Sequence, residues 1–262
     1  MSSRAAVLRA LWRVNVVEEL QYRANFVVSV LSTLFWLGMA LLTLALFFNH
    51  TTRLGGWEYW EVVVLLGVFN ALTGAIEAVL RPGIGGLAED VRSGALDLVL
   101  VRPVDAQLYV SFRRLDIWRF ADLLLGLGLS AYAVARLGRA LSVGEVLAFA
   151  ATFAAAVAVV YAIWVALMSL AFWVVAVENI AVLFDTVYEA ARYPVTAYPG
   201  ALRFLFVYLI PIAWTTTVPA SALTGRLAPH TAVGAIAVGV TALVLARLLW
   251  RVALRKYTSA GG

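Results

Sequence analysis

The sequence of 262 residues has no cysteine and a single lysine, and each absence excludes a class of site. Without cysteine the chain has neither a disulfide framework nor a thiolate metal centre. The only lysine, Lys256, is not part of a G-x-x-x-x-G-K-[ST] motif, so the chain has no P-loop of its own for ATP. An H-E-x-x-H zinc motif and a G-x-S-x-G nucleophile motif are absent as well.

Histidine and charge are also scarce. His50 and His230 lie far apart beside predicted outside loops, which is typical of interfacial polar residues rather than ligands, so no metal site is expected. Charged residues make up 13% of the chain and hydrophobic residues 63%, against roughly 45–50% apolar residues in a soluble domain. The pI near 9.7 reflects arginines confined to certain loops, so we expect no nucleic-acid binding.

Six long stretches are nearly free of charge, and about 20 apolar residues suffice for a helix to cross a bilayer. They predict an all-α integral membrane protein with six transmembrane helices in one domain, 1–262. The predicted spans cover residues about 26–48, 60–80, 120–137, 146–177, 203–224 and 228–250. The third is the weakest, and the fourth exceeds what a bilayer requires, so it is tilted, broken or extended into water.

The distribution of basic residues predicts the orientation. Sixteen of the 20 Lys and Arg residues fall in the N-terminal segment, the second and fourth gaps and the tail, and four fall in the other gaps. Because short outside loops are poor in Lys and Arg, both termini are expected in the cytoplasm, with the spans in the cytoplasmic (inner) membrane.

The N-terminal segment, 1–25, is expected to be an interfacial helix on the inner membrane surface and not a cleavable signal peptide. Leu8, Leu11 and Trp12 share one side of this helix. Arg9 and Arg13 lie on the other side. The alternative is a cytoplasmic extension of the first span.

The second gap, 81–119, is the most informative cytoplasmic loop. Arg81-Pro82-Gly83 should end the second span, since proline cannot continue a helix. A short helix is expected over 87–93, closed by Gly94. Its exposed side would carry Glu89, Asp90 and Arg92. A second amphipathic stretch, 106–119, leads back to the membrane. The residues expected to support this loop are Arg102, Pro103, Arg113, Arg114 and Asp116.

Polar residues inside a span are costly and usually face the protein interior or a water-filled path. In the second span Asn70, Thr73, Gly74 and Glu77 follow the i, i+3, i+4, i+7 spacing of one helical face. This face is predicted to line a route through the membrane or a seam between subunits. Glu77 alone has a second interpretation, an ion pair with Arg81 one turn later.

The fifth predicted span holds Pro211 and Pro219, which each free a backbone carbonyl. Trp214, Thr215, Thr216 and Thr217 lie between them, and threonine hydroxyls can bond to such carbonyls. A bent or broken helix near the outer end is therefore expected. The alternative is a structural kink whose threonines bond only to their own helix.

Several stretches resemble a known family. The run GALDLVLVRPVDAQLYVSFRRLD, 94–116, is similar to the first cytoplasmic loop of ABC-type exporter permeases of the type 2 class, in the bacterial branch with six spans and no fused ATPase. The segment 22–26 resembles the entry to the first span in that branch. The segments 193–199 and 209–225 resemble the approach to the fifth span, and that span with its outer loop. The resemblance covers essentially the whole chain.

The resemblance implies a permease subunit that forms the translocation pathway and joins a second permease, identical or a sister chain, and two copies of a separate P-loop ATPase. ATP and magnesium would belong to the ATPase, so this chain is expected to have no cofactor and no catalytic residue. The short helix would be a coupling helix seated in a groove of the ATPase. The residues placed at this contact are Leu87, Glu89, Asp90, Arg92, Ser93, Gly94 and Leu96, the last as an apolar anchor. The residues 211–219 would lie beside the exit gate.

Three other interpretations stay open at this stage, and one of them is a membrane scaffold that transports nothing. A stand-alone secondary transporter driven by an ion gradient often shows two similar halves and paired intramembrane carboxylates, and no clear internal repeat is present here. The loop 81–119 could also be a solvated connector, although it is long for one. The apolar, aromatic-rich spans favour hydrophobic or amphipathic cargo over small ions.

Overall fold

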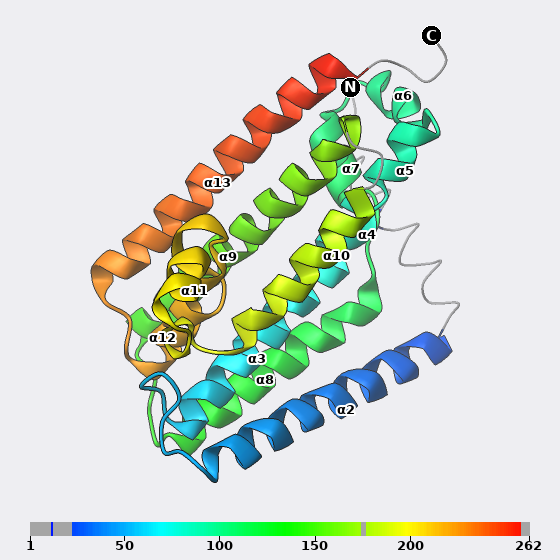
Figure 1. The fold of residues 1–262 in the computed structure, drawn as a ribbon. Coiled ribbons are helices and arrows are strands. Elements are labelled where there is room, and N and C mark those ends of the chain that lie inside the picture. Colours follow the sequence, from blue (N-terminus) through cyan, green and yellow to red (C-terminus); the bar gives the residue numbers. More distant parts are fainter. Residues whose placement is uncertain (1–11, 13–22, 174–176, 258–262) are drawn as a thin grey trace.

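The computed structural model describes residue 12 and residues 23–173 and 177–257, and Figure 1 shows long helices lying side by side. Within these residues the regular structure is helical, apart from one isolated bridge in a loop, so the predicted all-α fold is confirmed. The predicted interfacial helix over 1–25 lies outside the described residues except for Trp12 and the first turn of α2. The Trp12 Nε1 donates a hydrogen bond to the Phe112 carbonyl at 2.8 Å.

The helices follow one another with short connections. The first half of the chain contains α2 (Arg23–Phe48), α3 (Tyr59–Ala75), the π-helical turn η1 (Ile76–Leu80), α4 (Arg81–Ile84), α5 (Leu87–Arg92), α6 (Ala95–Leu100), α7 (Ala106–Phe112), η2 (Ile117–Arg119) and α8 (Phe120–Arg136). The second half contains α9 (Val143–Ser169), η3 (Leu170–Phe172), α10 (Val177–Tyr188), η4 (Glu189–Arg192), η5 (Val195–Ala197), α11 (Gly200–Phe204), η6 (Leu205–Leu209), η7 (Ile212–Trp214), α12 (Thr217–Thr224) and α13 (Pro229–Lys256).

Several of these elements are long and apolar enough to cross a membrane. Among the described residues the five such runs are Phe26–Phe48, Tyr59–Arg92, Ile117–Arg136, Val143–Phe172 and Pro229–Lys256. A sixth candidate is the pair Gly200–Leu209 and Ile212–Thr224, whose two halves are bent by 73°. The chain is therefore a multi-pass membrane protein.

The two ends of the bundle differ in character (Figure 1). One end carries α4 to α7, which we call the platform, together with the start of α2 and the end of α13. The opposite end carries the loops after α2, α8 and α12, and beside them the bent pair 200–224, which we call the hairpin. We refer to these as the platform end and the hairpin end.

The helix α10 runs between these two ends. Asp185 of α10 forms an ion pair of 2.6 Å with Arg81 at the platform end. Further along, Thr196 Oγ1 donates a hydrogen bond of 2.6 Å to the Gly55 carbonyl in the loop after α2, at the hairpin end. The segment from α10 to η5 therefore runs the length of α3.

The sequence had placed 178–203 in a loop at the platform end, and this prediction was wrong. The charges of Asp185 and Glu189 concealed the helix, but each is paired within the protein, with Arg81 and Arg192 respectively. If Arg192 and Arg203 are assigned to the hairpin end, fourteen Lys and Arg residues remain assigned to the platform end and six to the hairpin end. The excess of basic residues therefore stays at the platform end.

The predicted fifth span, 203–224, is instead the hairpin, and both of its ends lie at the same end of the bundle. It starts just after Thr196, which is bonded to Gly55. It ends at Arg226, which is paired with Glu61 in the first turn of α3. Hydropathy alone could not separate a hairpin that enters and leaves at one end from a straight span.

The helix α3 lies at the centre of the bundle, and its side chains are buried on nearly every side. It packs most closely against α8, because glycines on both helices remove the side chains between them. A methyl group on Gly74 would overlap the Leu123 backbone nitrogen, and one on Gly126 would overlap that of Ala71. Close approach through small residues is the usual way in which membrane helices associate.

The second span does not end at Arg81-Pro82-Gly83, contrary to the prediction. Pro82 has no N–H for the Ala78 carbonyl, but the Asp116 N–H donates to that carbonyl instead, at 2.9 Å. The π-helical turn η1 directly precedes this point. The span therefore continues through α4 into the platform.

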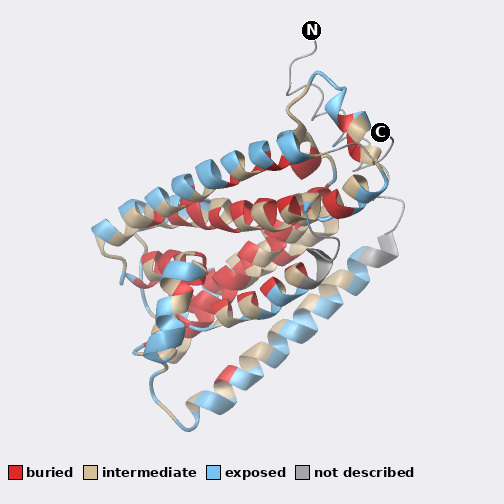
Figure 2. Ribbon diagram, turned by 45° about the horizontal axis from the view of Figure 1, so that its top comes forward, coloured by how far each residue is buried: buried red, intermediate tan, exposed pale blue. Residues whose placement is uncertain are grey.

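In contrast to α3, the helix α2 is hardly covered by the rest of the chain (Figure 2). It contacts the bundle at a few points along its length. Thr33 Oγ1 donates to Asp122 Oδ1 at 2.5 Å, Phe26 packs on Trp118, and Leu44 is buried. A cavity of about 230 Å³ lies between α2, α3 and the segment around Arg192.

The absence of cysteine makes the path of the chain directly testable. We expect Gly200→Cys to react with a membrane-impermeant maleimide from the same side as Ala140→Cys and from the side opposite to Ser93→Cys, since all three positions are exposed and the first two lie at the hairpin end. The measurement is labelling of intact cells before and after permeabilisation. Labelling of Gly200→Cys together with Ser93→Cys would restore the topology inferred from the sequence.

The contact between α3 and α8 gives a second prediction. Gly126→Ala should lower the free energy of unfolding by about 1–3 kcal/mol, the usual cost of overpacking. Gly128→Ala on the same helix is the matched control, because nothing lies within 4 Å of its added methyl group. Unfolding in mixed detergent micelles measures both. Equal stability of the two variants would contradict the close contact.

Candidate functional site

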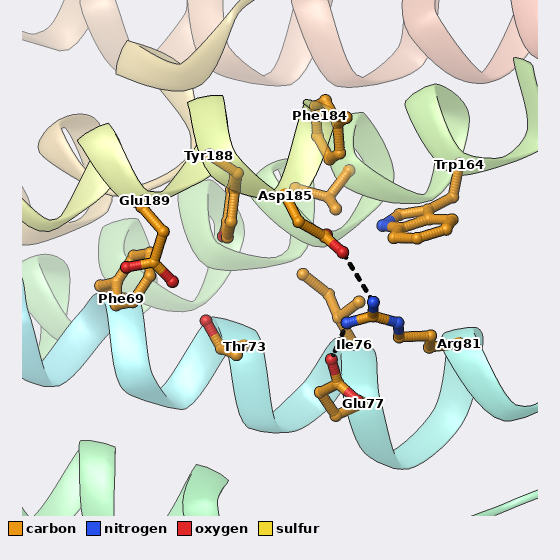
Figure 3. A pocket seen from close by; sticks show the side chains of 11 residues that line it. Phe69, Thr73, Ile76, Glu77, Arg81, Trp164, Phe184, Asp185, Tyr188 and Glu189 are labelled. Carbon is orange, nitrogen blue, oxygen red and sulfur yellow. Dashed lines mark hydrogen bonds and ion pairs between the residues drawn. The ribbon is translucent and has the colours of Figure 1, made fainter. Parts of the chain in front are cut away.

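A cavity of about 160 Å³ lies between α3 with η1, α9 and α10 (Figure 3). Its apolar walls include four aromatic rings, those of Phe69, Trp164, Phe184 and Tyr188. Its charged lining consists of Glu77, Arg81, Asp185 and Glu189. A mixed cavity of this kind within a membrane bundle is a candidate site for polar or charged ligand groups.

Arg81 is the central charge of this cavity. Its guanidinium forms ion pairs with Glu77 one turn earlier and with Asp185 of α10, the latter at 2.6 Å (Figure 3). It also lies over the Trp164 ring, 5.2 Å from the ring centre. The structure thus contains the predicted Glu77–Arg81 pair and joins to it a second carboxylate from a distant part of the sequence.

The predicted polar face of α3 divides into two. Asn70 and Gly74 face α8: the Asn70 amide donates to the Asp122 carbonyl at 3.0 Å, and Gly74 abuts the backbone at Leu123. Thr73 and Glu77 face the cavity. Residues at i, i+3, i+4 and i+7 spread over a wide arc, so two different neighbours can share them. Only Thr73 and Glu77 of this set meet at the cavity.

Two hydroxyl groups at the cavity are buried without a hydrogen bond of normal geometry. They are those of Thr73 and Tyr188, and the Tyr188 hydroxyl interacts only weakly with the hydroxyls of Thr73 and Thr215. Buried polar groups normally find a partner, so unpaired hydroxyls facing a cavity indicate room for a further hydrogen-bonding group.

At the platform end, the short helix predicted over 87–93 is present as α5. Gly94 ends it with a φ of 73°, the left-handed conformation that favours glycine. Glu89 and Arg92 form an exposed ion pair of 2.8 Å, and the Ser93 hydroxyl donates to the Glu89 carbonyl. These three residues are available at the surface.

Three residues assigned to the surface contact are placed differently by the structure. Leu87 and Leu96 are fully buried in the core, so Leu96 is not an exposed apolar anchor. The Asp90 side chain turns inward to pair with Arg113, and both are largely covered. The most exposed apolar residues here are Leu98 and Val101, with exposed fractions of 67% and 80%. The i, i+3 spacing of a single turn could not distinguish the buried side from the exposed one.

The residues predicted to support the loop have separate roles. Arg102 lies over the Tyr109 ring and donates to its hydroxyl at 2.6 Å, and Pro103 follows in the bend before α7. Arg114 is exposed. The Asp116 carboxylate caps η2 by accepting from the Trp118 N–H. These contacts, with Asp90–Arg113, hold the platform in one arrangement.

A buried polar network, which the sequence did not indicate, ties the platform to α13. Arg247 forms an ion pair with Asp105 at the start of α7 and donates to Gln107 Oε1 at 2.8 Å. Gln107 in turn donates to the Tyr161 hydroxyl of α9 at 3.2 Å. Burial acts to raise the pKa of Asp105, but hydrogen bonds from Arg247 and the Leu108 N–H, with the charge of Arg247, hold this pKa below its usual value.

The hairpin is held by hydrogen bonds from residues that the sequence singled out. In a continuous helix the Val207 carbonyl would accept a hydrogen bond from the N–H of residue 211, but Pro211 has no N–H. The Trp214 indole N–H donates to the Val207 carbonyl instead, at 3.1 Å. Pro219 lies in the first turn of α12, where its missing N–H costs no helical bond. The carbonyl freed by Pro211 is therefore satisfied by Trp214 and not by a threonine.

The three threonines differ in their partners. Thr215 donates to the Ile212 carbonyl one turn back. Thr216 donates to the Ala191 carbonyl at 2.7 Å, and Thr217 accepts from the Val195 N–H at 3.2 Å. In a continuous helix the Val195 N–H would donate to the Ala191 carbonyl. Where the chain leaves η4 this bond is lost, and Thr216 and Thr217 pair with the carbonyl and the N–H respectively.

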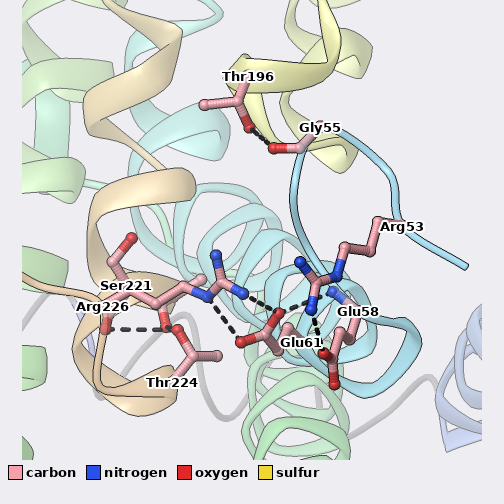
Figure 4. Close-up of polar contacts among 9 residues, drawn as sticks. Arg53, Gly55, Glu58, Glu61, Thr196, Ser221, Thr224 and Arg226 are labelled. Atoms are coloured by element: carbon pink, nitrogen blue, oxygen red, sulfur yellow. Dashed lines mark hydrogen bonds and ion pairs between the residues drawn. The ribbon is translucent and has the colours of Figure 1, made fainter.

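An ion pair fastens the hairpin end of the bundle (Figure 4). The Arg226 guanidinium makes two hydrogen bonds of 2.6 Å to the Glu61 carboxylate in the first turn of α3, and it lies over the Trp57 ring. Exposed fractions of 38% and 11% for the two side chains make this pair less accessible to water than Arg53–Glu58 nearby, at 66% and 56%. The two pairs resemble each other in type and differ in burial.

The sequence analysis thus missed Asp185, Arg247 and the pair Glu61–Arg226. Glu61 and Arg247 lie within predicted spans and Arg226 lies between two of them, positions where an unpaired charge is costly, whereas Asp185 lies in a predicted loop. That signal was present in the sequence, but it did not identify the partners, which are between 104 and 165 residues away.

Comparison with known proteins agrees with this architecture. The model of a family described as ABC-2 family transporter protein matches residues 34–261, which is most of the chain. The searches of curated proteins and of solved structures each found no match.

The pair Glu61–Arg226 gives a testable prediction. A double-mutant cycle with Glu61→Gln and Arg226→Gln should give a coupling free energy of about 0.5–3 kcal/mol, as for residues in direct contact. The matched cycle with Glu58→Gln and Arg53→Gln should give about 0.2–1 kcal/mol, because that pair is exposed. Unfolding in mixed micelles measures both cycles. A coupling for Glu61–Arg226 no larger than that of the exposed pair would contradict its role as a fastening.

Proposed function

The chain belongs to the ABC-2 family of transporters, and on this basis we propose that it is the permease subunit of an ATP-driven exporter with a separate P-loop ATPase. It forms part of the transport machinery and carries no catalytic centre for ATP hydrolysis. Two permeases, identical or sister chains, would assemble with two ATPase chains. ATP and magnesium would be bound by the ATPase.

The platform is the observation that supports coupling to a partner. Its outer surface presents Glu89, Arg92 and Ser93 beside the exposed apolar Leu98 and Val101. Its parts are held together by Asp90–Arg113, and it is joined to the spans through the Asp116–Ala78 hydrogen bond and Arg247–Asp105. A surface held this firmly would transmit a push from an ATPase to α3 and α13.

The orientation follows from the same proposal. An ATPase works in the cytoplasm, so the platform end would lie there, with the start of α2 and the end of α13. The excess of Lys and Arg at this end supports that orientation in the inner membrane. The hairpin end would then face outward, with the hairpin beside the exit of the transport route.

The experiment is to tag the chain, solubilise it gently from its native membrane and identify the proteins that co-purify. We expect a P-loop ATPase in a ratio near one to one, and its loss when Glu89 and Arg92 are exchanged as Glu89→Arg with Arg92→Glu. This exchange keeps an ion pair on α5 but changes the pattern that a partner would meet.

The matched control is the exchange Arg53→Glu with Glu58→Arg, which alters an exposed ion pair at the hairpin end. It should leave the ATPase bound. A second permease in the same eluate would distinguish a heterodimer from a homodimer. Absence of any ATPase in several mild detergents would contradict the proposal, and transport driven by an ion gradient would then be measured.

A further inference from the structure

The cavity between α3, α9 and α10 carries an excess of negative charge. Of the four charged side chains that line it, three are carboxylates and one is a guanidinium. Glu189 is neutralised by Arg192, 2.6 Å away. Glu77 and Asp185 then share the single cation Arg81. Among the described residues, one negative charge is left without a cation of its own, and within a membrane bundle such a charge attracts one.

The walls of the cavity suit an organic cation. Two guanidinium groups already lie over its rings, Arg81 over Trp164 and Arg192 over Phe69, both at 5.2 Å from the ring centre. The rings of Phe184 and Tyr188, which stack on each other, complete an aromatic lining. Aromatic faces attract cations through their quadrupole, and the attraction strengthens when water is excluded.

The buried hydroxyls define the cation further. Tyr188 is more than nine-tenths buried, and its hydroxyl and that of Thr73 lie at the cavity without a hydrogen bond of normal geometry (Figure 3). Asp185 lines the same cavity, so a cation with N–H groups would meet both hydroxyl and carboxylate acceptors there. Within the described residues no three His, Asp or Glu side chains come together in a way that could hold a metal ion.

We propose that this cavity binds the protonated amine of an amphipathic cargo molecule. The ammonium group would lie between Asp185, Tyr188 and Thr73, with the adjoining carbon chain against the aromatic rings. About 160 Å³ holds such a head group but not a whole drug-sized molecule, for which pockets of about 300–1,000 Å³ are usual. The rest of the cargo would leave past Glu189, whose side chain is the most exposed of the charged lining at 52%.

This inference deepens the proposed function by naming the class of cargo, and it rests on that function only in calling the ligand cargo. The test therefore measures binding to the chain alone. The purified full chain is placed in nanodiscs of a zwitterionic lipid, and binding of labelled hexylammonium is measured by equilibrium dialysis against empty nanodiscs. Hexan-1-ol, of the same shape and without charge, is the comparison ligand.

We expect saturable binding of hexylammonium at one site per chain, and binding of hexan-1-ol at least about tenfold weaker, as for the loss of a hydrogen bond between charged groups. Asp185→Asn, which removes the excess charge, should weaken hexylammonium binding by about tenfold or more. Tyr188→Phe keeps the ring and the charges and should weaken it severalfold. Glu58→Gln, a carboxylate outside the cavity, should leave it unchanged.

Equal binding of the amine and the alcohol, or full binding by Asp185→Asn, overturns the proposal. Each variant is first checked for a single peak in size-exclusion chromatography. If Asp185→Asn does not fold, Tyr188→Phe decides in its place, and full binding by that variant overturns the proposed geometry. A negative binding assay would contradict the amine site and would say nothing about the ATPase partner. A negative co-purification would contradict the ATPase partner and would say nothing about amine binding, so the two proposals can be rejected independently.

Discussion

Inside a bilayer a backbone N–H or carbonyl that loses its partner has no water to replace it, and the path of this chain depends on that constraint. At several points where a helix is interrupted, a specific donor or acceptor takes up the freed group. Asp116 serves the Ala78 carbonyl ahead of Pro82, and the Trp214 indole serves Val207 ahead of Pro211. These replacements allow a continuous helix to lead into the platform and a hairpin to turn within the bundle.

Charged side chains inside the bundle need a partner even more than backbone groups do, because burying an unpaired charge costs more free energy. Asp185 and Arg247 lie where the bundle is mostly apolar, and each is paired with residues from another helix. Such pairs contribute little net stability, because desolvation offsets much of the attraction, but breaking one leaves a costly unpaired charge. They therefore fix which helices are neighbours. Through Arg81–Asp185 and Arg247–Asp105 the platform end of α3 is linked to α10, and α7 to α13.

The features of this fold that depend on local composition could be predicted from the sequence. Charge-free runs predicted the all-α membrane class, and Gly94 predicted the end of the short helix α5. The Glu77–Arg81 pair was one of two interpretations, and it is present because both residues lie on one helix. Predictions failed where distant partners decide. The charges of α10 suggested a loop because Arg81 and Arg192 were not known to neutralise them, and the apolar run at 203–224 suggested a straight span. Leu96 was assigned to the surface because a short apolar piece gives no sign of which side the core covers.

The loose attachment of α2 has a consequence for what surrounds it. In the part of the chain that the structure describes, most of its surface meets no other residue, and a cavity of about 230 Å³ lies between it and α3. A membrane helix exposed in this way leaves its apolar surface open to lipid or to another protein chain along most of its length. The bundle thus combines a closely packed interior around α3 with one helix whose surface is left to its surroundings.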